Sequence, residues 1–107
     1  MPEYEIYRIG NREIFITGTP CKSKEISLLK KMIRSIGFSD ELIKVEKIEN
    51  AEFIIAFGNN YFQYEKQIPI KLINHPSFIL KDYTNRILEY WEHWLTVRKS
   101  IEECRLV

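Results

Sequence analysis

Cysteine, histidine, glycine and proline are all scarce in this chain of 107 residues, with two, two, four and four copies. The two cysteines, Cys21 and Cys104, form neither a C-x-x-C pair nor a zinc-ligand spacing. An iron–sulfur cluster normally takes four thiolates, so none is expected. The glycine-rich phosphate-binding loops of nucleotide-binding proteins are missing too. The sequence therefore predicts reduced thiols, no metal site and no cofactor.

An excess of one charge is also lacking, because 16 basic residues face 15 acidic ones and the net charge is +1. Dedicated nucleic-acid binders usually carry a strong basic excess, so any DNA contact is expected to be local and weak. No apolar run approaches the roughly 20 residues of a membrane span. The start, Met1–Glu5, is acidic and lacks the apolar segment of a signal peptide. We expect a cytoplasmic chain without membrane contact.

What the chain does contain indicates one α/β domain over residues 1–107. Strands are predicted at Glu5–Arg8 and Glu13–Thr17, joined by a hairpin-type turn at Gly10-Asn11. Ile14–Thr17 and Phe53–Phe57 are apolar without alternation, which is typical of central strands buried on both faces. We therefore expect a three-layer sandwich with a mostly parallel central sheet.

The remaining elements follow from periodicity and capping signals. A helix is predicted from an N-cap at Ser23 to a stop at Gly37, and a strand at Ile43–Glu46. A short helix or turn is expected at about 60–66, followed by a strand at Ile68–Ile73. The charged end, 98–107, is expected to fray.

A long aromatic helix is predicted after an N-cap at Thr84, and it contains both tryptophans of the chain. Its wide apolar stripe should pack mainly on the sheet. One sheet face in so small a domain is not expected to cover both indoles, and exposed tryptophan is typical of protein interfaces. We therefore predict that either Trp91 or Trp94 is partly exposed and binds a partner.

The motif His75-Pro76-Ser77 follows the strand predicted at Ile68–Ile73 after one intervening residue. Ligands of open α/β sheets bind at the carboxyl ends of strands, so His75 and Ser77 are candidate site residues. A lone histidine in this place is more often structural, bonding a backbone carbonyl. A thiol site at Cys21, placed before a helix N-terminus, is a weaker alternative.

Three segments in this order resemble the uracil-DNA glycosylase superfamily: the strand Phe53–Gly58, the His75-Pro76-Ser77 motif and the helix Ile87–Leu95 with its tryptophan. The resemblance implies a glycosylase-like fold that acts on a base flipped out of the duplex. It also implies that His75 donates a hydrogen bond to the base, that Ser77 contacts a phosphate and that Phe78-Ile79-Leu80 form an apolar wedge.

The loop Gly18–Lys22 departs from that pattern. It offers Thr19 where a glycosylase needs an acidic or amide residue to hold water, and Glu25 lies in the following helix. Gly18 and Thr19 therefore count as DNA-contact candidates only. We expect a non-catalytic module, with residual glycosylase-type activity or base binding through His75 as the alternative.

In length, strand order and its tryptophan helix, the chain is similar to the psi-subunit family of the bacterial DNA polymerase III holoenzyme. Proteins of that family have a glycosylase-like topology without the activity. The resemblance implies two protein partners, a chi-like subunit and the clamp-loader collar, and a role in DNA replication.

Overall fold

The computed structural model describes residues 4–57 and 68–105. Five strands form a single sheet in the order β3 (Leu42–Val45), β1 (Glu5–Ile9), β2 (Ile14–Gly18), β4 (Phe53–Phe57) and β5 (Ile70–Ile73). Every residue of β2 and β4 is buried, so the prediction that these two apolar runs are central strands is confirmed.

The sheet is mixed, and the prediction of a mostly parallel sheet is wrong. β1 pairs antiparallel with both β2 and β3, whereas β4 pairs parallel with β2 and β5. The hairpin turn, where Gly10 has φ +52°, forces β1 to run against β2. β3 then pairs antiparallel with the other edge of β1.

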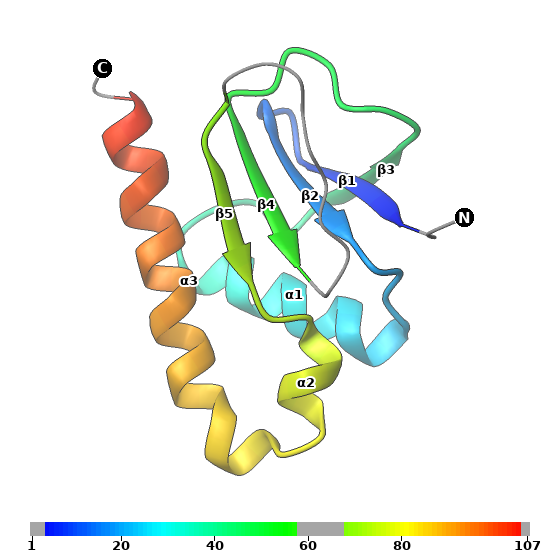
Figure 1. Cartoon of the computed structure of the whole chain (residues 1–107), viewed down its shortest axis with the longest axis vertical. Helices are drawn as coiled ribbons and strands as arrows, with labels where there is room; N and C mark the ends of the chain where they lie inside the picture. The colour runs from blue at the N-terminus through cyan, green and yellow to red at the C-terminus, as the bar shows by residue number, and fades with distance from the viewer. Residues whose placement is uncertain (1–3, 58–67, 106–107) are drawn as a thin grey trace.

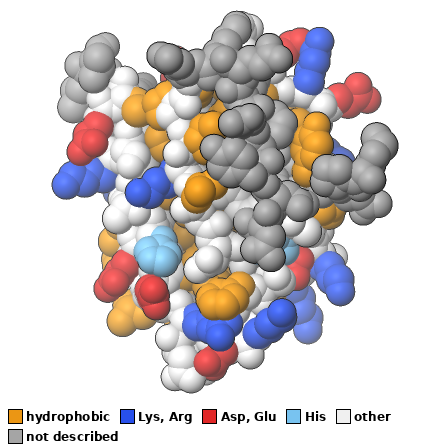
Figure 2. Space-filling model, viewed as in Figure 1, with side chains coloured by type: hydrophobic (Ala, Val, Ile, Leu, Met, Phe, Trp, Pro, Cys, Tyr) orange, Lys and Arg blue, Asp and Glu red, His pale blue; other side chains and the backbone are white. Residues whose placement is uncertain are grey.

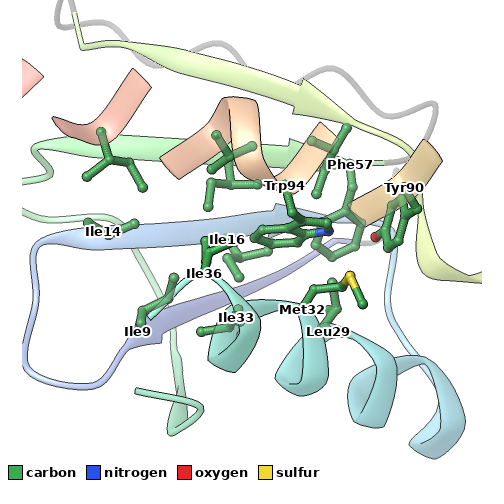
Figure 3. Close-up of a cluster of buried hydrophobic side chains, with 14 of the residues drawn as sticks. Ile9, Ile14, Ile16, Leu29, Met32, Ile33, Ile36, Phe57, Tyr90 and Trp94 are labelled. Atoms are coloured by element: carbon green, nitrogen blue, oxygen red, sulfur yellow. The ribbon is translucent and has the colours of Figure 1, made fainter. Parts of the chain in front are cut away.

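All three described helices pack on one face of this sheet (Figure 1), so the described residues form two layers and not the three that were predicted. They are α1 (Ser23–Ser35), α2 (Pro76–Leu80) and α3 (Tyr83–Arg105). Their buried side chains form one core with the alternate strand residues that point to the same face, among them Ile14, Ile16 and Phe57 (Figure 3). Ile6, Phe15, Ile48 and Ile54 form a smaller cluster on the opposite face. The helix or turn expected at 60–66 lies outside the described residues.

The ends of α1 show why the helix occupies this stretch. It starts one residue earlier than predicted, because Lys22 is the N-cap and its backbone N–H donates to the Glu25 carboxylate at 2.7 Å. At the other end Gly37 has φ +89°, as its predicted role requires. Gly37 N–H donates to the Arg34 carbonyl, and the next N–H donates to the Ile33 carbonyl. This pair of bonds closes the helix in a Schellman motif.

The helix α3 begins at Tyr83 and continues to Arg105, so the fraying expected from residue 98 onward is not observed over this range. Val97 and Ile101 are buried, and they hold the last turns against the core. Arg98 and Glu102 form an ion pair one turn apart at 3.0 Å. Among the described helices, none combines the length and the apolar character needed to cross a bilayer.

Candidate functional site at the carboxyl end of the sheet

The parallel strands β2, β4 and β5 end at the same edge of the sheet, and the chain segments that leave β2 and β5 meet there (Figure 1). The segment after β2 carries Thr19, Pro20 and Cys21 into α1, and the segment after β5 carries His75 into α2. The structure therefore brings together His75, Ser77 and Thr19, three of the residues that the sequence singled out.

The His75 ring is held through both of its nitrogens. It is the N-cap of α2, and its Nδ1 accepts the Ser77 N–H at 3.0 Å. In the neutral ring the proton is therefore on Nε2, which donates to the Thr19 carbonyl at 3.1 Å and lies 3.3 Å from the Pro20 carbonyl. The edge of the ring also packs on Phe57, with centroids 5.2 Å apart. Each polar atom of His75 thus has a partner within the protein.

The Cys21 thiol is the nearest nucleophilic group to this ring, with Sγ 3.5 Å from His75 Nε2. Burial raises the pKa of the Cys21 thiol to about 12, and the negative charges of Glu25 and Glu5 add to the effect. The lowering that a helix N-terminus gives a thiol is outweighed here. The raised pKa disfavours the thiolate at neutral pH and so argues against thiol chemistry at Cys21.

Two carboxylates border the thiol, and each is tied to a backbone N–H. Glu25 caps α1 through Lys22, while Glu5 accepts the Cys21 N–H at 3.3 Å. Glu5 also forms an ion pair with Lys44 at 2.7 Å, and the hydrogen bond from Lys44 holds the Glu5 pKa below its usual value. Sequence reasoning missed Glu5, although the hairpin turn places it opposite Gly18 at this edge.

Gly18 supports the site through backbone packing. A Cβ on this residue would overlap the carbonyl oxygen of Phe57 in the neighbouring strand, and its φ of +156° is rare for other residues. Glycine is therefore needed for the close approach of β2 and β4, which positions the loop containing Thr19.

The segment Phe78-Ile79-Leu80, which the resemblance assigned to an apolar wedge, lies within α2. Its three side chains differ in exposure. Phe78 is 44% exposed and carries the Arg86 guanidinium 3.8 Å above its ring, whereas Ile79 is buried in the core. Leu80 is partly buried against the same core. Only Phe78 projects from the surface, because a short helix turns consecutive side chains in different directions.

The two tryptophans of α3 differ in the way the sequence predicted. Trp94 is fully buried and contacts Tyr90 edge-on, while Trp91 is 37% exposed. Trp91 is thus the indole that a partner can reach. Leu88, one turn earlier on α3, is 67% exposed. We call Leu88 and Trp91 the α3 patch.

Two pockets lined by residues that the structure describes lie away from His75. One, of about 450 Å³, is lined by residues of β1, β2 and the segment after β3, including Arg8, Phe15 and Lys47. The other, of about 360 Å³, lies between β5 and the end of α3 and includes Ile70 and Cys104. The face seen in Figure 2 mixes acidic, basic and hydrophobic side chains rather than presenting one basic field.

No protein-family model, curated protein or solved structure matches this chain.

Proposed function

We propose that this protein is a non-catalytic interaction module that binds a protein partner through the α3 patch. The observation that supports this most is the bonding of His75. Both ring nitrogens of His75 are bonded within the protein, Nδ1 to the Ser77 N–H and Nε2 to the Thr19 carbonyl, so a substrate would have to displace one of these bonds. The ring joins two loops and so has a structural role.

The neighbouring acids support the same proposal. Glu5 is engaged by Lys44 and by the Cys21 N–H, and Glu25 is engaged by the backbone of Lys22. A water-activating carboxylate must present an oxygen to water beside the substrate. Both carboxylates here instead fix the path of the chain from β2 into α1.

The α3 patch supplies the surface for a partner. Trp91 and Leu88 are three residues apart on a helix, so their side chains lie on the same side of it. An exposed indole next to an exposed leucine is the kind of anchor on which interface energy concentrates. In its most specific form, the proposal is a psi-like accessory subunit that contacts a chi-like subunit and the clamp-loader collar in the cytoplasm. This form depends on the order of elements and the tryptophan helix.

Binding of the purified chain to the chi subunit and to the clamp-loader complex encoded in the same genome tests this proposal. Isothermal titration calorimetry with the wild-type chain should show a complex with at least one of them. Trp91→Ala should weaken it by roughly 30-fold, the equivalent of about 2 kcal/mol at an interface anchor. Glu92→Ala changes an exposed neighbour on the same helix and is the matched control.

Circular dichroism of each variant shows whether the fold is intact. Absence of any complex would overturn the psi-like form of the proposal. Equal loss of affinity in Trp91→Ala and Glu92→Ala would remove the α3 patch from it.

A further inference from the structure

We infer that Cys21, Glu25 and His75 form a binding site for a Zn²⁺-class transition-metal ion. One donor atom from each residue lies within 4.8 Å of the other two. The site lies at the carboxyl end of the sheet and involves no residue of the α3 patch. A bound ion would replace the hydrogen bond from His75 Nε2 to the Thr19 carbonyl that the metal-free chain has.

The donor set identifies the class of metal. Thiolate sulfur, imidazole nitrogen and carboxylate oxygen are the ligands that Zn²⁺ takes in proteins, whereas Mg²⁺ and Ca²⁺ prefer oxygen alone. Tetrahedral bonds of about 2.3 Å to sulfur and 2.0 Å to nitrogen place those two ligand atoms roughly 3.5 Å apart. Cys21 Sγ and His75 Nε2 are 3.5 Å apart, as two corners of such a site require.

A fourth corner is also available. The Thr19 carbonyl oxygen lies 3.1 Å from His75 Nε2 and 3.8 Å from Cys21 Sγ. These separations suit a further oxygen ligand, with water as the other source of this position. All three side chains are partly exposed, so an ion can enter from solvent without unfolding the chain.

The surrounding contacts would hold these ligands in place. Metal binding at Nε2 moves the ring proton of His75 to Nδ1, where Ser77 Oγ, 2.8 Å away, can accept it. A hydrogen bond of this kind from the distal ring nitrogen is the usual support of a metal-bound histidine. The Ser77 N–H, which donates to Nδ1 in the metal-free chain, loses this acceptor when the ion binds. Glu25 is held by its backbone contact to Lys22, so the carboxylate stays at the start of α1.

Charge favours occupation by a dication. Zn²⁺ would displace the proton of the Cys21 thiol to solvent, and the resulting thiolate and the Glu25 carboxylate would together neutralise the ion. Glu5 beyond them is balanced by Lys44. The ligands join the segment after β2, the first turn of α1 and the start of α2. A bound ion would therefore stabilise the same edge of the sheet that His75 holds in its absence.

The test uses the full chain and Zn²⁺ alone as the probe. Competition with a chromophoric chelator should give one equivalent of Zn²⁺ per chain, and Co²⁺ should show a thiolate-to-cobalt charge-transfer band. Cys21→Ala should abolish that band. Cys21→Ala and His75→Asn should each weaken Zn²⁺ binding at least about tenfold. His75→Asn keeps an N-cap acceptor for α2, so loss of the fold is separated from loss of the ligand.

Cys104→Ser and His93→Ala are the matched controls, because they remove the other cysteine and the other histidine of the chain. Both should bind Zn²⁺ as the wild type does. Absence of binding, or binding that Cys104→Ser abolishes and Cys21→Ala does not, would overturn the inference. Neither result bears on the chi-subunit titration, so the two proposals fail separately.

Discussion

Cys21 Sγ and His75 Nε2 lie 3.5 Å apart although 54 positions separate them in the chain. The raised pKa of the thiol, about 12, makes Cys21 a poor nucleophile. In metal-free protein at pH 7.5, we expect iodoacetamide to modify the exposed Cys104 first and Cys21 much more slowly. Peptide mass spectrometry over time measures both rates. Faster modification of Cys21 would show that the thiol is activated after all.

The Cys21 thiol should also cause the free energy of unfolding to fall at alkaline pH. The pKa of Cys21 rises from 9.0 to about 12 on folding, so the folded chain holds this proton more tightly than the unfolded chain does. The contribution of this proton to the free energy of unfolding is fully present below pH 9 and is lost as the pH rises toward 12. Urea denaturation at intervals from pH 7 to 11 measures it.

Tyr7 also contributes to this pH dependence, because burial raises its pKa from 10.0 to about 12. The stability that it contributes begins to decline near pH 10, whereas that of Cys21 begins to decline near pH 9. Cys21→Ala should therefore remove the decline that begins near pH 9 and leave the later one. An unchanged profile in Cys21→Ala would contradict this assignment.

Gly18→Ala should destabilise the fold more than Gly37→Ala. Both glycines have positive φ, but a Cβ at Gly18 would overlap the Phe57 carbonyl, whereas nothing lies within 4 Å of one at Gly37. Gly37→Ala carries only a conformational cost of about 1 kcal/mol. Gly18→Ala has an additional cost, because β2 and β4 must move apart to make room for the Cβ. We expect this to lower the free energy of unfolding by roughly a further 1–3 kcal/mol. Urea midpoints of the two variants compare them, and equal midpoints would refute the packing argument.

Trp94 and Trp91 should differ both in the stability lost on truncation to alanine and in the quenching of their fluorescence by iodide. Trp94→Ala removes a fully buried indole and should lower the free energy of unfolding by about 3–5 kcal/mol. Trp91→Ala should lower it by much less, because that side chain is 37% exposed. Fluorescence of the wild type should be partly quenched by iodide, and Trp91→Ala should remove the quenched fraction. Quenching that persists in this variant would place the accessible indole elsewhere.

Uracil should not be excised from DNA by this protein. His75 has no free nitrogen for the base, and both nearby carboxylates are engaged by the protein itself. A single-turnover assay on uracil-containing single-stranded DNA with enzyme in excess measures the release of base. Release that disappears in His75→Ala would restore the alternative of a glycosylase-type enzyme.

Local signals predicted much of this fold. The turn at Gly10, the stop at Gly37 and the largely apolar runs of β2 and β4 each act within a few residues, so they could be recognised in the chain. The direction of β3 could not, because its position beside β1 depends on which sheet edge remains free after the hairpin forms.

The candidate site was predicted only in part. His75, Ser77 and Thr19 stood out by residue type and by their place after strands. The sequence did not show that Cys21 and Glu25 lie close to His75, because metal-ligand spacing rules describe ligands that are close in sequence. Here the parallel pairing of β2, β4 and β5 brings the ligands together, and such pairing leaves no local mark.

The sheet order also has a consequence for the growing chain on the ribosome. Residues up to 45 contain β1, β2, α1 and β3, whose antiparallel pairs need no later segment. Until β4 is synthesised, however, β2, which is apolar from Ile14 to Ile16, keeps one edge unpaired. An unpaired apolar edge readily recruits other strands, so we expect this nascent intermediate to aggregate more readily than the chain in which β4 has paired with β2.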